Sequence, residues 1–132
     1  MVYIKKITSF KDKRGILSVI EQKKIKLFNF NRIFFIKFSK KKITRGQHAH
    51  KKCFQFIFCL SGRVRLTTID KNLKKKQIIL SKIDKGVFIK PLVWVEISSE
   101  KVNTMVACLA SRKYEKSDYI NNFIKFKKII KR

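Results

Sequence analysis

Two histidines separated by one residue are the side chains of this sequence best suited to chemistry near neutral pH. They are the only histidines among the 132 residues, and they occupy positions His48 and His50. On an extended strand, residues i and i+2 point to the same side, so the two imidazoles should share one space. Two imidazoles in one pocket indicate either metal ligation or proton transfer.

The rest of the sequence argues against a metal. A zinc or iron site usually takes at least three side-chain ligands from histidine, cysteine or carboxylate. The sequence has no third histidine, and Gln55 occupies the place where a barrel metal site would offer a glutamate. A cysteine or Glu96 could still complete a site through the fold, and the pair could also be solvated strand histidines without function. General acid–base catalysis, without metal or other cofactor, is the interpretation that we favour.

A second pair, Trp94 and Glu96, has the same i, i+2 spacing. Trp94 alone is more typical of a core than of a ligand platform. Glu96 lies between Val95 and Ile97, where an unpaired buried carboxylate would be unfavourable. Glu96 is therefore a candidate to orient a histidine or to accept a ligand hydroxyl, with a salt bridge to a lysine as the ordinary alternative.

The elements that must position these residues are short strands. Segments rich in β-branched and aromatic residues recur at regular intervals, which predicts an all-β fold, a small antiparallel barrel or sandwich. Ser61-Gly62 predicts a tight hairpin turn, and Asp70–Asn72 predicts the next turn. Alternate strand positions would line a pocket in such a barrel. The predicted strands are Val2–Thr8, Leu17–Glu21, Ile33–Phe38, Cys53–Leu60, Arg63–Ile69, Lys76–Leu80, Val87–Ile89, Trp94–Ile97 and Thr104–Ala110.

The C-terminal segment has a different periodicity. After Ser117-Asp118, a suitable N-cap, apolar residues recur at helical spacing and lysines fall on the opposite face. We therefore predict one C-terminal α-helix over residues 119–130 that lies on the sheet, within a single domain spanning residues 1–132. The apolar positions are Ile120, Phe123, Ile124, Phe126, Ile129 and Ile130.

Length and composition restrict the class of protein. A chain of 132 residues with 45% hydrophobic content suits one compact domain with a real core. No apolar run reaches the roughly 18 residues of a membrane helix, and the first residues do not resemble a signal peptide. Cys53, Cys59 and Cys108 lie in apolar runs without metal-binding spacing, which is typical of buried thiols in a reducing compartment such as the cytoplasm.

The formal net charge of +26 would suit nucleic acid, an acidic membrane or an anionic substrate as a partner. The lysines are spread from Lys5 to Lys131, and the runs Lys40–Lys42 and Lys74–Lys76 fall in predicted loops. Such an even distribution is more typical of a biased genome composition than of selection for one partner. We expect non-specific attraction to polyanions at low salt, but no specific nucleic acid and no membrane as partners.

Several motifs, taken in order, resemble a known enzyme family. They are Arg14-Gly15-x-Leu17-x-x-x-Glu21, Arg45-Gly46-x-His48-Ala49-His50-Lys51, Gln55, Trp94-x-Glu96, Leu109-Ala110-Ser111-x-x-Tyr114 and Ser117-Asp118-Tyr119-Ile120. The ordered set is similar to that of the sugar-nucleotide 3,4-ketoisomerases, enzymes of the cupin (jelly-roll) fold that act on dTDP-4-keto-6-deoxyglucose. The resemblance implies migration of the ketone of a dTDP-linked keto-sugar from C4 to C3 without metal or nicotinamide. The product would serve the synthesis of a 3-amino sugar for surface glycans.

The resemblance also implies roles for individual residues. His48 would move the proton between the two carbons and His50 the proton between the two oxygens, an order that the sequence leaves open. Arginines are candidates for phosphate or sugar contacts, because a guanidinium binds phosphate oxygens in bidentate fashion. Salt bridges are an equal alternative for Arg14 and Arg32, and Lys51 could stabilise an enediolate or face water. The substrate-binding candidates are Arg14, Arg32, Arg45, Lys51, Gln55, Trp94 and Glu96.

The sequence departs from the family pattern at four positions. Phe34 and Phe35 follow Arg32 where relatives usually have tyrosines, Val95 replaces a polar or basic side chain, and Asn121 replaces an arginine. None of these departures touches the histidines. They leave the product stereochemistry at C4 open, and the choice between dTDP and UDP is equally invisible in the sequence.

Members of this family are dimers, often with the N-terminal strand exchanged between subunits. Val2–Ile4 is apolar enough to serve as an added edge strand, and free edges need covering. We therefore expect a homodimer. Two other functions remain open from the sequence alone, namely epimerisation of a nucleotide sugar on the same fold and non-catalytic binding of a nucleotide sugar or nucleic acid.

Overall fold

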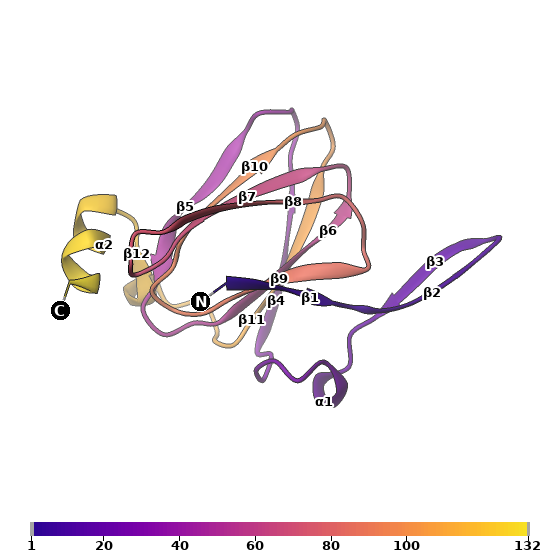
Figure 1. Ribbon diagram of the computed structural model, residues 1–132, viewed down its shortest axis with the longest axis horizontal. Helices are drawn as coiled ribbons and strands as arrows, with labels where there is room; N and C mark the ends of the chain where they lie inside the picture. Colours follow the sequence, from indigo (N-terminus) through magenta and orange to yellow (C-terminus); the bar gives the residue numbers. More distant parts are fainter. Residues whose placement is uncertain (1, 132) are drawn as a thin grey trace.

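Two antiparallel sheets of five strands each face one another in the computed structural model, which describes residues 2–131 (Figure 1). The first sheet has the order β1 (Val2–Lys6), β9 (Lys85–Ile89), β6 (Gln55–Ser61), β11 (Met105–Ala110) and β4 (Arg32–Lys37). The second has the order β12 (Tyr119–Ile120), β5 (Thr44–His50), β10 (Trp94–Ser99), β7 (Val64–Ile69) and β8 (Lys75–Leu80). The predicted all-β antiparallel fold is confirmed.

The core between the sheets is built from alternate strand residues. On β7, Val64 and Leu66 are fully buried, whereas Arg65 between them is only partly buried. This is the alternation expected of a strand with one face against the core. Residues from both sheets meet in this core, among them Ile57, Cys59, Val87, Val95, Val106 and Cys108.

Strand β6 is buried on both faces. Its residues from Gln55 to Cys59 are all buried, which explains why the sequence shows a nearly continuous apolar run there rather than an alternation. A second apolar cluster covers the outer face of the first sheet. It joins Phe56 and Phe58 to Ile25 of the short helix α1 (Gln22–Ile25) and to Phe28 in the loop that follows.

The C-terminal helix α2 (Phe123–Ile130) covers part of the outer face of the second sheet, where Phe126 is fully buried beside Trp94. The predicted helix is thus confirmed, but it begins at Phe123 rather than at residue 119. Asn122, not Ser117-Asp118, is the N-cap, because its side-chain oxygen accepts a hydrogen bond from the backbone N–H of Lys125 at 3.0 Å. The preceding residues form a 3₁₀ turn (Lys116–Asp118) and then β12, which pairs with β5.

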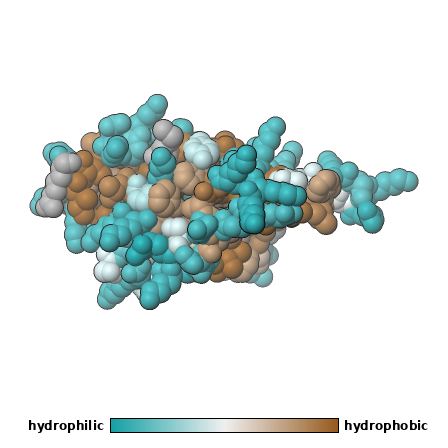
Figure 2. All heavy atoms as spheres, turned by 90° about the horizontal axis from the view of Figure 1, so that it is seen from below, coloured by the Kyte–Doolittle hydropathy of each residue, from teal (hydrophilic) through white to brown (hydrophobic). Residues whose placement is uncertain are grey.

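The N-terminal segment forms two separate features. Strand β1 pairs with β9 of its own chain. After Ile7, β2 (Thr8–Asp12) and β3 (Gly15–Val19) form a two-stranded sheet of their own that projects from the barrel (Figures 1 and 2). The predicted strand Val2–Thr8 is therefore divided, and the strand predicted from Leu17 begins at Gly15. We call residues 8–19 the arm.

The turn predicted at Asp70–Asn72 is confirmed, but the hairpin predicted at Ser61-Gly62 is wrong. Ser61-Gly62, with Gly62 at a φ of +81°, connects β6 to β7, which belong to different sheets and do not pair with each other. Between β7 and β8, Oδ1 of Asp70 accepts hydrogen bonds from the backbone N–H groups of Asn72 at 2.8 Å and Lys74 at 3.0 Å. Within residues 2–131, no helix has the length and apolar character of a membrane span. The three cysteines are free and buried.

Candidate active site

A β-bulge sets the direction of the two histidines on β5. Val95 of β10 lies opposite His48 and Glu96 lies opposite Gly46, so Gln47 is the extra residue of the bulge. Gly46 and Gln47 both have positive φ angles, +85° and +53°. After the bulge the imidazoles face the inside of the barrel, while Ala49 between them faces the cluster beneath α2.

The two imidazoles lie next to each other. Their ring centroids are 5.1 Å apart and their planes are nearly perpendicular, at 86°. Tyr119 of β12 lies beside both rings, 4.9 Å from His48 and 4.4 Å from His50 between centroids. The i, i+2 spacing in the sequence therefore does bring both rings into one space.

Each imidazole has its proton fixed by an acceptor. Nδ1 of His48 lies 2.9 Å from the carbonyl oxygen of Gly46, and Nδ1 of His50 lies 3.0 Å from Oδ2 of Asp118. A carbonyl or carboxylate oxygen can only accept, so in the neutral rings both Nδ1 atoms carry the hydrogen. Both Nε2 atoms then hold a free lone pair, and both rings present a basic atom.

Asp118 is buried and accepts several hydrogen bonds. Besides Nδ1 of His50, it accepts the backbone N–H of Lys52 through Oδ1 at 2.8 Å and that of Cys53 through Oδ2 at 3.3 Å. Burial alone would raise the pKa of this carboxyl, but these hydrogen bonds bring the pKa below its ordinary value. Asp118 is therefore ionised at neutral pH, and it fixes the tautomer and orientation of the His50 ring.

Burial lowers the pKa of both histidines. For His48 it outweighs the hydrogen bond to Gly46, which acts in the opposite direction. For His50 burial lowers the pKa to about 4, although the hydrogen bond to Asp118 opposes it, and the charges of His48 and Arg32 lower it further. Both rings are thus neutral at cellular pH, and each can accept a proton at Nε2.

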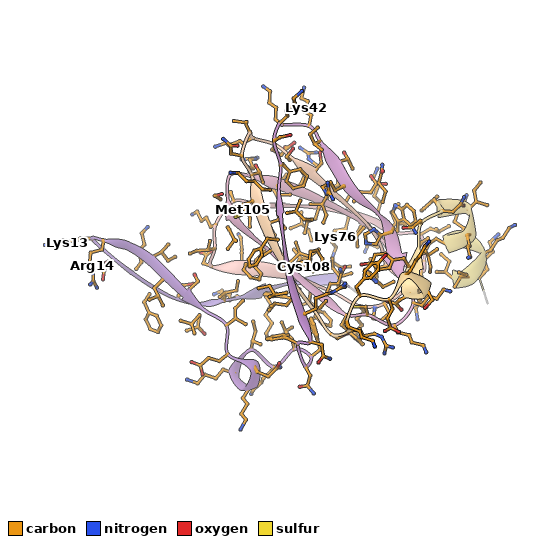
Figure 3. The ribbon with its side chains drawn as sticks, turned by 180° about the vertical axis from the view of Figure 1, so that it is seen from behind. Lys13, Arg14, Lys42, Lys76, Met105 and Cys108 are labelled. Atoms are coloured by element: carbon orange, nitrogen blue, oxygen red, sulfur yellow. The ribbon has the colours of Figure 1, made fainter. Side chains whose placement is uncertain are left out.

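A cavity of about 240 Å³ lies between the two sheets, and His48 is part of its wall. The other polar wall residues are Arg45, Gln55 and Tyr119. His50, only 4% exposed, is not on the wall but lies directly behind His48 and Tyr119. Most of the wall is apolar and includes Phe34, Ile36, Ile57, Val95, Ile97 and Cys108, the last of which Figure 3 labels on β11. A small molecule with one polar end would suit this space.

The predicted cationic contacts lie in different places. Arg45 lines the cavity, and Arg32 lies half-buried at the start of β4. Lys51 is exposed in the turn after β5. Arg14 lies at the tip of the arm, away from the barrel, where it pairs with Asp12 (Figure 3). Arg14 is thus separated from the cavity of its own chain.

Trp94 and Glu96 lie on the other side of the sheet from the cavity. They share a face, as their spacing predicts, and Nε1 of Trp94 donates a hydrogen bond to Oε2 of Glu96 at 3.1 Å. That face is the outer one, because Trp94 packs against Phe123 and Phe126 of α2. This placement corrects the expected position of the pair beside the histidines: Val95 faces the cavity in their stead.

One group of side chains has donor atoms of the kinds that metals bind. His50, Cys53 and Asp118 are buried, and their ligand atoms lie within 4.8 Å of one another. The Asp118 oxygens already accept three N–H groups, and Nδ1 of His50 needs its hydrogen for one of these contacts. A metal ion would have to displace these hydrogen bonds. As it stands, the group is a carboxylate that orients a histidine.

The contributions of Asp118 and Tyr119 to this site do not follow from the sequence. The local pattern places Asp118 in a helix N-cap, whereas in the structure it contacts a histidine 68 positions away in the chain. No local pattern reveals such a contact. The one signal in the sequence is the Ser117–Ile120 motif. Two of its residues, Tyr119 and Ile120, form β12, and the pairing of β12 with β5 places the motif beside His50.

The fold and the site together define a jelly-roll protein with a small-molecule cavity between its sheets, as in the cupins. The family model FdtA (WxcM-like, C-terminal) matches residues 1–131. The chain belongs to this family.

Individual relatives agree with this assignment. A TDP-4-oxo-6-deoxy-alpha-D-glucose-3,4-oxoisomerase from Aneurinibacillus thermoaerophilus is 36% identical over 128 residues, which cover 95% of this chain and 91% of the relative. A solved TDP-quinovose 3,4-ketoisomerase from Campylobacter jejuni is 28% identical, with a TM-score of 0.88 and coverage of 96% of this chain and 97% of that chain.

A sugar 3,4-ketoisomerase from Thermoanaerobacterium thermosaccharolyticum, solved in complex with TDP, has a TM-score of 0.92 at 35% identity, covering 98% of this chain and 94% of that chain. A histidine-to-asparagine variant of the same enzyme was solved with TDP-4-keto-6-deoxyglucose and has the same TM-score of 0.92. These comparisons confirm the resemblance to the sugar-nucleotide 3,4-ketoisomerases.

Proposed function

We propose that this protein is a sugar-nucleotide 3,4-ketoisomerase that moves the ketone of a TDP-4-keto-6-deoxyhexose from C4 to C3. Membership of the family and the activities of the named relatives support this proposal. The observation that carries it is the pair of neutral imidazoles, 5.1 Å apart, with both Nε2 atoms free to accept a proton.

The reaction requires two proton transfers and no external oxidant. Nε2 of His48, on the cavity wall, takes the proton from C3, which the neighbouring carbonyl makes acidic, and returns it to C4. The C3 hydroxyl loses its proton to Nε2 of His50, which delivers it to the oxygen on C4. The electron pair of the broken C3–H bond passes through an enediol, so the C4 ketone becomes a hydroxyl while the C3 hydroxyl becomes a ketone.

The polar wall residues give this substrate an orientation. Arg45 is suited to the diphosphate because its guanidinium offers planar, paired donors. Gln55 can donate to or accept from a sugar hydroxyl. Both proton transfers need only protein side chains. The three buried free thiols suit a reducing compartment, so a cytoplasmic enzyme that precedes the amination of a sugar destined for surface glycans stays our prediction.

The arm supports a homodimer. A two-stranded hairpin is marginal on its own in water, and this one exposes Phe10 by 64% and Leu17 by 57%, which lie directly opposite each other in the β2–β3 register. A second copy of the chain would cover them. Arg14 at the tip of the arm would then act, if at all, in the cavity of the partner.

Proton NMR of the protein with TDP-4-keto-6-deoxyglucose tests the activity. The expected result is a new sugar spin system with the carbonyl at C3, formed by the wild type and lost in His48→Asn and His50→Asn. In D₂O, deuterium should appear at C4 to the extent that the proton held on Nε2 of His48 exchanges with solvent before it is returned to carbon. Deuterium incorporation without carbonyl migration would instead indicate an epimerase, and conversion unaffected by both variants would remove the proposed mechanism.

A further inference from the structure

Two buried polar atoms in this region have no hydrogen-bond partner among residues 2–131, namely Nε of Arg32 and Nε2 of His50. They are complementary. The guanidinium Nε–H can only donate, whereas Nε2 of His50 can only accept, because Asp118 holds the ring hydrogen on Nδ1. Leaving both unpaired would cost the desolvation of a charged donor and of an acceptor. A single hydroxyl group of a ligand could satisfy both atoms, because it can accept the Nε–H of Arg32 and donate its own hydrogen to Nε2 of His50.

The fold directs Arg32 toward the interior. On β4 it shares the parity of Phe34 and Ile36, which pack against the core between the sheets. In the register of the first sheet, Arg32 and Gln55 both lie opposite Ala110, so the three residues form one row across the inner face. Gln55 is on the cavity wall. Arg32 therefore lies two strands away from Gln55, at the same height along the strands.

Aromatic contacts connect Arg32 to the histidines. Its guanidinium carbon lies 5.2 Å from the ring centre of Phe34 and 5.9 Å from that of Tyr114. Tyr114 lies 5.5 Å from Tyr119, and Tyr119 lies 4.4 Å from His50. Among the described residues, Arg32 forms no salt bridge within 4.0 Å. Its positive charge is consequently available to an anionic group of a ligand, and the nearby charge also lowers the pKa of His50.

We propose that Arg32 and His50 hold one oxygen of the keto-sugar between them, and that Arg32 stabilises the negative charge that develops on this oxygen. The inference rests on the proposed function and assigns Arg32 to the reacting sugar rather than to the diphosphate. Before the reaction, the C3 hydroxyl donates its hydrogen to Nε2 of His50 and accepts Nε–H of Arg32. When His50 takes the proton, the oxygen on C3 becomes the oxyanion of the enediolate. The guanidinium of Arg32 then stabilises this negative charge until the ketone forms at C3.

The test compares catalysis with nucleotide binding in Arg32→Gln and Arg32→Lys. Lysine keeps the charge but lacks the planar Nε–H donor, so both variants should lose kcat by about 100-fold, the usual effect of removing one oxyanion donor. The Kd for TDP, which lacks the sugar, should stay within about twofold of the wild type by calorimetry. Arg63→Gln, which alters an arginine outside the cavity wall, is the matched control and should change neither quantity.

A second measurement separates a catalytic role from a structural one. Guanidinium ion added to Arg32→Ala should restore part of kcat, because it can occupy the vacated donor position, whereas it should not affect Arg63→Gln. If Arg32→Gln weakens TDP binding while retaining kcat, or if neither variant loses kcat, the assignment is overturned and the proposed function stands. A wild-type protein that binds TDP without converting the keto-sugar would overturn the proposed function together with this assignment.

Discussion

The protonation of each imidazole is set by a single acceptor, the half-buried Gly46 carbonyl for His48 and the buried Asp118 carboxylate for His50. Equal tautomers make the two rings chemically alike, so their different tasks must come from their positions. His48 is on the cavity wall, whereas His50 is almost wholly buried behind it. This placement supports His48 as the group that exchanges a proton with carbon, and His50 as the group that exchanges one with an oxygen reaching past the wall.

Replacement of Asp118 by asparagine tests the orientation of His50. Asparagine has one acceptor oxygen, which cannot serve His50 and the N–H groups of Lys52 and Cys53 as the carboxylate does. If its amide N–H₂ faces the ring, the hydrogen moves to Nε2 and the basic atom is lost. We expect kcat to fall by about 1,000-fold, while the Kd for TDP is unchanged in calorimetry.

The neighbouring Ser117→Ala is the control for Asp118→Asn, because Ser117 is exposed and should leave kcat unchanged. A positioning role also predicts a change in the pH profile of kcat/KM, since the hydrogen bond to Asp118 raises the pKa of His50 against the effect of burial. Asp118→Asn with normal kcat and a normal profile would show that the carboxylate does not orient the catalytic ring.

The lowered pKa of His50 links stability to pH. The folded ring, with a pKa of about 4, binds a proton less readily than the unfolded chain, whose ring has a pKa near 6.5. Protonation therefore favours unfolding, and the free energy of unfolding should fall as the pH drops from 6.5 toward 4. The loss is at most on the order of 3 kcal/mol, from 1.36 kcal/mol per pKa unit. Urea titrations at several pH values measure it.

His50→Asn should remove most of this dependence, because asparagine does not titrate. The carboxylate of Asp118, whose pKa lies below 3.8, contributes stability that is lost only at still lower pH, so the two effects fall in separate windows. A wild-type stability that is constant from pH 6.5 to 4 would contradict a neutral buried His50.

At the scale of elements, the bulge on β5 determines where the histidines point. A Cβ at Gly46 would lie 3.0 Å from the carbonyl oxygen of Val95, and the φ of +85° is unfavourable for any residue with a side chain. We expect Gly46→Ala to destabilise the fold by about 1–3 kcal/mol. It should also reduce kcat, because the Gly46 carbonyl holds Nδ1 of His48.

Gln47→Gly is the matched comparison for Gly46→Ala. Gln47 is the adjacent residue of the bulge and has a φ of +53°, a left-handed conformation that glycine adopts freely. The substitution should not destabilise the fold in thermal unfolding, because relief of the left-handed conformation offsets the added freedom of the unfolded chain. If Gly46→Ala unfolds like the wild type, the bulge is not held by this glycine.

The elements also show how far the sequence could predict the site. Alternation and spacing were sufficient for most of the strands, the Asp70–Asn72 turn and the shared face of the histidines, because these depend on neighbours along the chain. They did not reveal β2 or β12, nor that the chain passes from one sheet to the other after Ser61-Gly62. Parity placed Trp94 and Glu96 together but could not say which face of β10 meets the cavity. That choice depends on α2, which covers the outer face, and on β12, which uses Tyr119–Ile120 as a strand.

At the scale of the whole molecule, charge and apolar surface act against each other. A net charge of +26 per chain makes two copies repel each other at low salt. A stable dimer would therefore need apolar burial that exceeds this repulsion, and the exposed Phe10 and Leu17 of the arm offer such a surface. The association should strengthen as salt screens the charges, the reverse of the behaviour of a complex with nucleic acid.

The double variant Phe10→Ser with Leu17→Ser tests this association directly. Analytical ultracentrifugation at micromolar concentration should show a dimer for the wild type and a monomer for the variant, because serine removes the apolar area that the second copy would cover. Ile124→Ser is the control, because Ile124 is 62% exposed, close to the 64% of Phe10, but lies on α2 rather than on the arm. If the arm also brings Arg14 to the partner's cavity, the monomeric variant should lose turnover while retaining its fold by circular dichroism. A wild type that stays monomeric at this concentration, or a double variant that still dimerises, would mean that the arm does not join two chains.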